Sequence, residues 1–168
     1  MTISLHKISV YVFARRLRGL SICLGKTQTL YAEKKYDEAT LLNYRFFPDM
    51  FNFTKQVQST TDHALGCAAR LAGSEPPQNE NKETSLAALI ARIDKAVEYL
   101  DAVKPEQIDG AEDKVITVKR GDTETKYSGL EFVLNRAMPN FYFHVTTAYD
   151  IMRHNGVEIG KRNFMGEN

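Results

Sequence analysis

The sequence predicts an all-α protein, a four-helix bundle that carries one small β-hairpin before its last helix. Over four long segments, apolar residues repeat at intervals of three and four, which is the spacing of one helix face. One stretch, 114–127, instead shows the two-residue period of strands. The chain has 168 residues, the length of one domain, so we expect residues 1–168 to fold as a single unit.

The first helix is expected over residues 1–32, which carry basic side chains and no acidic one. Its apolar stripe keeps three- and four-residue spacing through Ile3, His6, Val10, Phe13, Leu17, Leu20, Leu24, Thr27 and Tyr31. A cleavable targeting peptide shares this charge bias, but it does not need a stripe of this length. We therefore interpret the segment as the basic first helix of the bundle.

The second helix is expected from Phe51 to Ala72, because Gly73 is the kind of residue at which helices commonly end. The positions on its apolar face are Phe53, Val57, Thr60, Ala64, Cys67 and Leu71. A polar segment with two prolines, 74–81, follows this helix. It predicts a stiffened crossover to the next helix.

The third helix is expected from about Ser85 to Val103, with Thr84 or Ser85 as its N-cap. Its apolar face comprises Leu86, Leu89, Ile93, Val97 and Leu100. The opposite face carries charged residues, among them Arg92, Lys95 and Asp101. We expect these to be ordinary solvated charges.

The hairpin and the last helix complete the bundle. In 114–127, β-branched residues come first, a turn follows at Arg120–Asp122, and Thr and Tyr then alternate with charged residues. The last helix is expected from Ser128 to about Asn155, with a stripe through Leu130, Leu134, Ala137, Phe141, His144, Ala148 and Ile151. Proline lacks a backbone donor, so this segment should kink at Pro139 or divide into a short and a longer helix there.

Charge and cysteine content exclude several classes of function. The 22 Lys and Arg against 21 Asp and Glu leave a net charge of +1, whereas nucleic-acid-binding domains normally carry a basic excess. No apolar run approaches the roughly 18 residues of a membrane span. We therefore expect no nucleic acid and no membrane among the partners. Two cysteines, Cys23 and Cys67, are too few for a secreted disulfide framework, which favours buried thiols and a cytoplasmic location.

Three polar side chains fall where the core of a bundle should be apolar: Gln56 on the second helix, and Asn140 and His144 on the last. Asn140 and His144 are four residues apart, so they face the same way. Burying an amide or an imidazole without a partner costs about 1–3 kcal/mol. These residues therefore either satisfy one another or line a wet pocket. His154, beside the helix end, is expected to complement the terminal carbonyls.

Short motifs that span most of the chain are Met1–Ser4, Pro48–Phe51, Gln56–Gln58, Arg70–Gly73, Glu75–Pro77, Asp109–Asp113, Asn140–Tyr149, His154–Gly156 and Gly160–Arg162. In these motifs the chain resembles the DinB/YfiT-like superfamily, and specifically its uncharacterised branch, domain of unknown function 1993. The resemblance implies a DinB-like four-helix bundle, a frequent homodimer, and a pocket in which three histidines often hold a divalent metal. Characterised superfamily members include low-molecular-weight-thiol transferases and isomerases.

The chain departs from the metal-binding pattern that the resemblance implies. Many members carry HxxxH on the last helix, with a glycine about twelve residues after the second histidine. Counting back from Gly156 places that histidine at His144 and the first at Asn140. The ligand on the second helix falls near Gln56 or Gln58, and an amide binds first-row metals poorly. We therefore predict no cofactor; a divalent metal such as Zn or Ni would need His144 together with His63.

Three functions remain open from the sequence. In the first, the protein binds a small organic molecule in a core cleft around His144, with Gln56 as a polar contact. Tyr142 and Tyr149 are further candidate ligand-binding residues, and His144 with Asn140 could catalyse metal-independent acid–base chemistry. In the second, the protein is a metal-dependent hydrolase or thiol transferase of DinB-like type. In the third, it is a non-enzymatic, homodimeric interaction module, so the sequence leaves open whether the protein is an enzyme.

Overall fold

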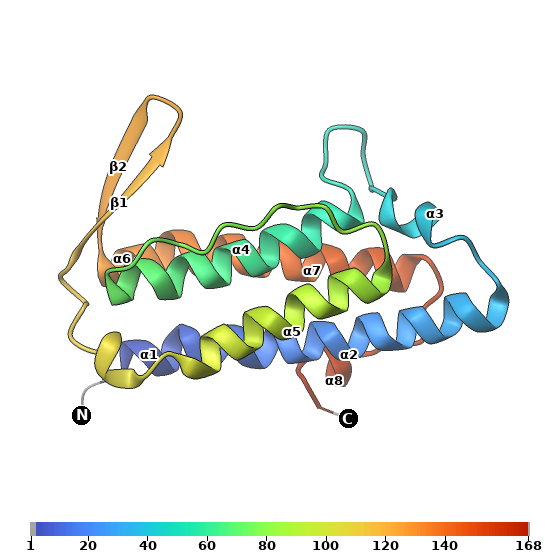
Figure 1. Cartoon of the computed structure of the whole chain (residues 1–168), viewed down its shortest axis with the longest axis horizontal. Helices are drawn as coiled ribbons and strands as arrows, with labels where there is room; N and C mark the ends of the chain where they lie inside the picture. The colour runs from blue at the N-terminus through green and yellow to red at the C-terminus, as the bar shows by residue number, and fades with distance from the viewer. Residues whose placement is uncertain (1–2, 168) are drawn as a thin grey trace.

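Four long helices pack along the length of the molecule in the computed structural model, which describes residues 3–167 (Figure 1). They are α2 (Val10–Lys34), α4 (Phe53–Ala72), α5 (Leu86–Ala102) and α7 (Met138–His154). α2 and α7 run in one direction, and α4 and α5 run in the other (Figure 1). This architecture, with a hairpin before α7, confirms the predicted fold class. No helix of the described residues has both the length and the apolar character needed to cross a bilayer.

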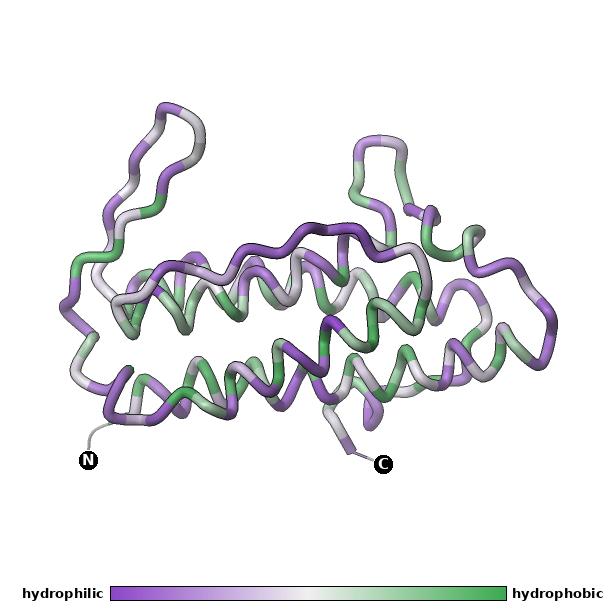
Figure 2. The backbone as a smooth tube through the Cα atoms, in the orientation of Figure 1, coloured by the Kyte–Doolittle hydropathy of each residue, from purple (hydrophilic) through white to green (hydrophobic). Residues whose placement is uncertain are grey.

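The predicted second and third helices and the crossover between them are confirmed. α4 begins after Asn52, whose side chain accepts a hydrogen bond from the Lys55 amide at 3.0 Å, and it ends at Gly73 with a φ of 81°. Ser85 caps α5 in the same way. Because α4 and α5 are parallel, the chain must return along α4 between them, and residues 73–85 do so as an extended, largely hydrophilic segment (Figures 1 and 2).

Arg92 of α5 attaches this crossover to the bundle, so the expectation that Arg92 is solvated was wrong. Its side chain is 6% exposed and forms ion pairs with Glu83 (2.7 Å) and Asp62 (2.6 Å). Its Nε donates to Thr61 Oγ1 at 2.7 Å. Glu83 belongs to the crossover, and only the tertiary fold brings it to α5. We call Arg92, Asp62, Glu83 and Thr61 the Arg92 cluster.

The predicted first helix is broken near its start. α1 (Leu5–Ile8) is separated from α2 by Ser9, whose φ of −120° and ψ of −84° leave the helical range. Ile3 was expected on the buried stripe but is 76% exposed. Residues 1–2 of the predicted helix lie outside the described part of the chain. The later stripe positions are buried as expected, namely Val10, Phe13, Leu17, Leu20, Leu24, Thr27 and Tyr31.

Short elements join the long helices. Those that the sequence did not predict are α3 (Glu38–Leu42), the 3-10 turn η1 (Pro105–Gln107) and α8 (Lys161–Phe164). The predicted hairpin is confirmed: β1 (Val115–Arg120) pairs antiparallel with β2 (Thr123–Ser128) and projects from one end of the bundle (Figure 1). α8 packs against α2 where Gly19 has no side chain, since a Cβ there would lie 2.7 Å from the Phe164 carbonyl oxygen.

The segment before Pro139 divides, as predicted, but with a different register. α6 (Gly129–Phe132) is followed by a π-helical turn, η2 (Val133–Ala137), and α7 starts with proline in its first turn. A π turn holds more residues than an α turn, so the positions before it rotate relative to α7. The expected stripe residues Leu130 and Leu134 are therefore 39% and 46% exposed, and Phe132 and Val133 are buried instead.

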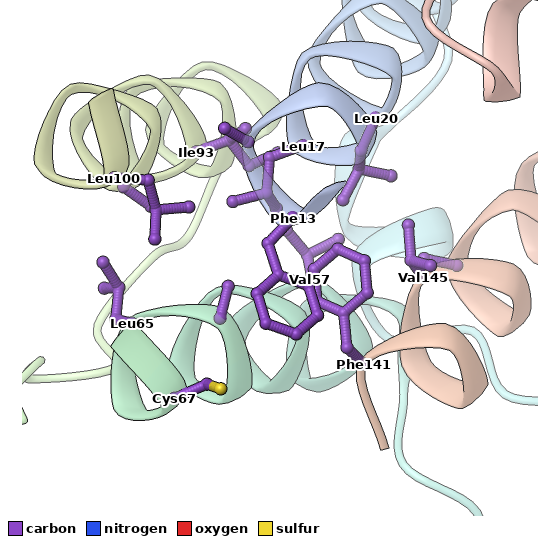
Figure 3. Packing of buried hydrophobic residues seen from close by; sticks show 14 of the residues in the cluster. Phe13, Leu17, Leu20, Val57, Leu65, Cys67, Ile93, Leu100, Phe141 and Val145 are labelled. Carbon is purple, nitrogen blue, oxygen red and sulfur yellow. The ribbon is translucent and has the colours of Figure 1, made fainter. Parts of the chain in front are cut away.

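The apolar core lies between the four long helices. Phe13 of α2 and Phe141 of α7 meet at its centre, with ring centroids 4.7 Å apart. Val57 of α4 and Ile93 of α5 approach the same layer (Figure 3). Beside this core, Gln56 and His63 of α4 lie against His144 of α7, whereas Thr61 of α4 contacts Arg92 of α5.

Candidate functional site

His144 is buried between rings from separate parts of the chain. It is 8% exposed. Phe51, from the loop before α4, stacks on one side, with centroids 6.0 Å apart and planes at 12°. His63 of α4 is also stacked with it, at 5.4 Å and 11°. Phe143 presents an edge at 5.3 Å. The sequence prediction that His144 points into the bundle is confirmed, and its neighbours are mainly aromatic.

Gln56 fixes the orientation of the His144 ring. Its Oε1 lies 2.7 Å from His144 Nδ1, and its Nε2 donates to the Phe51 carbonyl oxygen at 3.2 Å. Because the amide nitrogen is already a donor, Oε1 is the acceptor, and His144 Nδ1 must carry the hydrogen. The neutral ring therefore keeps a free lone pair on Nε2.

Burial keeps the His144 imidazole neutral. Desolvation is the largest cause, and nearby His63 and Lys55 add to it; together they lower the pKa of His144 to about 4. The pKa of His63 is also lowered, chiefly by desolvation, although Asp62 opposes the shift. At neutral pH both rings are uncharged, so they can accept hydrogen bonds.

A small cavity opens beside this arrangement. It measures about 270 Å³ and is lined by Asp49, Met50, Phe51, Gln56, Phe143 and His144. His144 Nε2 makes no hydrogen bond to any described residue. Within the described part of the chain, every fully buried side-chain nitrogen or oxygen does have a hydrogen-bond partner, so Nε2 is not fully buried. The Nε2 atom is therefore accessible. Apolar walls with a few accessible polar groups, here His144 Nε2 and the Asp49 carboxylate, are typical of small-molecule sites.

The structure does not bring the other predicted site residues to His144. Asn140 donates to the Arg136 carbonyl oxygen on its own helix at 2.7 Å. Tyr142 packs edge-on against Phe141, and Tyr149 packs against Phe164, with centroids 5.6 and 5.4 Å apart. Both tyrosines project from nearly the opposite side of α7 to His144, because residues two or five apart on a helix point in different directions.

The remaining two histidines lie elsewhere. His6 Nε2 is 3.1 Å from the Val103 carbonyl oxygen, at the opposite end of the bundle from the α3 loop. His154 is exposed and contacts the Tyr44 and Phe46 rings at 5.6 and 5.7 Å. The structure thus gives His154 aromatic neighbours in addition to its expected place at a helix end.

The donor set does not fit a divalent metal of the superfamily type. His144 and His63 face each other through their ring planes, whereas metal ligands must converge through nitrogen lone pairs. The Gln56 oxygen already accepts from His144, and the Asn140 amide nitrogen donates to the Arg136 carbonyl oxygen of its own helix. Among the described residues, no three His, Cys, Asp or Glu side chains gather around one point.

A second cavity adjoins His63 and was missed from the sequence. It measures about 190 Å³, and its lining includes Arg70 of α4 and Arg136 of η2. A signal was present: Gln56, His63 and Arg70 are spaced by seven residues, so they form one row along α4 over about 21 Å. The row faces α7, and polar residues at this spacing on a buried helix face predict a continuous site.

Both cysteines are buried and free, as predicted. Burial raises the pKa of Cys23 to about 11 and that of Cys67 to about 12. Cys67 lines the second cavity, yet its thiol stays protonated at neutral pH. Since the thiolate is the nucleophile, this cysteine contributes apolar surface to the cavity.

Residues 5–165 match a family described as Domain of unknown function (DUF1993). The crystal structure of a DinB family member protein from Shewanella denitrificans is similar, with a TM-score of 0.86 and 36% sequence identity. The match covers 98% of this chain and 93% of that chain. No curated protein matches the chain.

Proposed function

The chain belongs to the DUF1993 family, and on this premise we propose that it binds a small organic molecule in the cavity beside His144. The observation that carries the proposal is the Gln56–His144 hydrogen bond, which sets the imidazole tautomer and leaves Nε2 accessible. A ligand hydroxyl or amide N–H would donate to that atom. Phe51 and Phe143 would pack against the apolar part of the ligand.

Binding is better supported than catalysis. A general base works best when its pKa lies near the working pH. His144, with a pKa of about 4, is a weak base at neutral pH but remains a good hydrogen-bond acceptor. Asn140, proposed from the sequence as its catalytic companion, is engaged with the helix backbone. We therefore propose His144 as a binding residue.

A ligand-observed NMR screen of small aromatic alcohols and amides tests this function. We expect compounds that bind the wild-type protein to bind His144→Leu at least tenfold more weakly. His154→Leu serves as the matched control, because His154 lies on the same helix outside the cavity. Hits that bind all three proteins equally would contradict the proposal.

The metal-dependent alternative is tested with the same proteins. Elemental analysis of untagged protein would favour a DinB-like hydrolase or thiol transferase if it found a near-stoichiometric divalent metal that His144→Leu loses. Our proposal expects no such metal, because the donors around His144 do not converge.

We also propose that a second copy of the chain packs on an apolar surface away from this cavity. A hollow of about 670 Å³ lies in this surface, and its lining includes Ile3, Leu5, Ile8, Leu130, Leu134 and Tyr142. Lys7 and Glu112 line the same surface, so in a two-fold interface Lys7 of each copy could pair with Glu112 of the other.

Sedimentation should show a dimer that Leu134→Glu dissociates, whereas Val115→Glu on the hairpin leaves it intact. A monomeric wild-type protein would contradict this.

A further inference from the structure

Two arginines face the second cavity without an acidic partner in contact. Arg70 and Arg136 both line this space of about 190 Å³, and neither forms an ion pair with any described residue. Both are half-buried. Half-buried charges of the same sign are unfavourable neighbours unless a counter-charge joins them. The pKa of Arg70 is lowered, mainly by desolvation, and Arg136 is among the lesser causes.

Each guanidinium is held in place by a contact that leaves most of its donors free. Arg70 donates from Nη1 to the Gly66 carbonyl oxygen at 2.9 Å. A side chain at Gly66 would collide with that nitrogen, since a Cβ there would lie 2.7 Å away. Arg136 lies over the Tyr127 ring at 5.9 Å, and its Nη1 is 3.5 Å from the Tyr127 hydroxyl. A guanidinium has five N–H donors, so several remain for a ligand.

The other charges around the cavity do not neutralise this pair. Asp62 lines the cavity, but its Oδ1 already accepts from Arg92 at 2.6 Å and from Asn79 at 2.9 Å. Glu75 is near enough to raise the pKa of Arg70, yet it makes no ion pair with it. The hairpin closes one wall with Val118. The cavity thus has two cationic groups and one carboxylate, Asp62, which is ion-paired through Oδ1 to Arg92; the rest of its lining is uncharged.

We propose that this cavity binds an oxyanion, the carboxylate or phosphate group of a small molecule. Guanidinium groups present forked N–H donors that match the paired oxygens of such anions. His63 forms part of the cavity wall and stacks on His144, so one ligand could place its anionic group between the arginines and its apolar part toward Phe51. This extension to one shared ligand rests on the proposed function; oxyanion binding itself does not.

Calorimetric titration with inorganic phosphate, and separately with acetate, tests the site. We expect the wild-type protein to bind at least one of these anions with a millimolar dissociation constant. Arg70→Met and Arg136→Met should each weaken binding at least tenfold. Arg162→Met, an exposed arginine on α8, should leave it unchanged. Preference for phosphate or for acetate identifies which oxyanion the cavity accepts.

Two outcomes would overturn the proposal: no binding of either anion by the folded wild-type protein, or equal binding by all the arginine variants. His144→Leu separates this proposal from the proposed function. If it retains phosphate binding while the NMR screen finds no ligand at His144, the oxyanion site stands and the His144 cavity does not. If phosphate binding fails while His144 ligands are found, the reverse holds.

Discussion

The two polar faces of α4 differ in whether their charges are paired. Toward α5 and the crossover, Arg92 is held by two carboxylates and a hydroxyl, and its side chain is 6% exposed. Toward α7, Arg70 and Arg136 share a cavity without an ion pair in the described residues, beside two neutral imidazoles. On one side of α4 the charges are therefore paired within the protein, and on its other side two arginines have no ion-pair partner among the described residues.

The difference separates structural from functional polar groups. A buried charge whose partners all come from the protein fixes a chain segment, here the crossover that makes α4 and α5 parallel. A charge without such partners is better explained by something that the protein binds. We therefore expect substitutions on the α5 face to cause large losses of stability, and substitutions on the α7 face to cause smaller losses together with changed binding.

Breaking the α5 face has the largest expected effect. Arg92→Met leaves Asp62 and Glu83 without their cation; because both carboxylates keep some contact with water, we expect a loss of about 2–3 kcal/mol, below the roughly 3–5 kcal/mol of a fully buried pair. Urea unfolding followed by circular dichroism measures this loss. Lys95→Met, on an exposed position of the same helix, should change the free energy of unfolding by less than about 0.5 kcal/mol. Equal effects of the two substitutions would refute the structural role of Arg92.

Acid should weaken the protein through His144. Its pKa is about 4 in the folded protein, against 6.5 when unperturbed, so between these values the unfolded chain binds the proton more tightly. This contribution to stability is complete above about pH 6.5 and is lost as the pH falls toward 4. The loss is on the order of 2 kcal/mol, after allowing for the partial solvent access of the ring.

The comparison protein for this experiment is His144→Gln. Unfolding free energies measured at pH 7 and pH 4 should fall less in this variant than in the wild-type protein. Glu83 also has a lowered pKa, but it lies away from His144 and cancels in the comparison. His63 stacks on His144, so the comparison is repeated with His63→Gln in both proteins, where the difference should persist. An identical acid loss in the two proteins would show that His144 is not held neutral by burial.

Removing the Gln56 amide should have a smaller effect. Gln56→Met keeps the length of the side chain but leaves His144 Nδ1 and the Phe51 carbonyl without partners, at a cost of about 1–2 kcal/mol. Thermal unfolding measures it. In the background of His144→Leu the same substitution should cost clearly less, because the imidazole no longer needs an acceptor. Additive losses would mean that the hydrogen bond does not orient His144.

Much of the fold was predictable because local rules and tertiary packing agree. The end of α4 at Gly73, the N-cap of α5, the hairpin and the polar crossover all follow from residues close together in sequence. The π turn before Pro139 was not predicted, because a three-to-four-residue period cannot reveal an extra residue in one turn. Leu130 and Leu134 were consequently placed on the wrong face.

The candidate site was predictable in part. Gln56 and His144 were identified because polar residues on an apolar stripe need partners, and the structure joins them. Tyr142 and Tyr149 have side chains suited to ligand binding, but helix geometry turns them away from His144. The sequence does not distinguish Arg70 and Arg136 from other arginines, because arginine at a helix surface is ordinarily solvated. They line one cavity only because folding brings α4, η2 and the hairpin together.

The most direct test of whether the unpaired arginines serve binding and not stability compares the wild-type protein with Arg136→Met. The free energy of unfolding of each is measured with and without inorganic phosphate. Phosphate at ten times its dissociation constant should stabilise the wild-type protein by about 1.4 kcal/mol. Without phosphate, Arg136→Met should match the wild-type stability within about 0.5 kcal/mol, and phosphate should not stabilise it. A variant that loses as much stability as Arg92→Met, or that gains as much from phosphate as the wild-type protein does, would contradict the account.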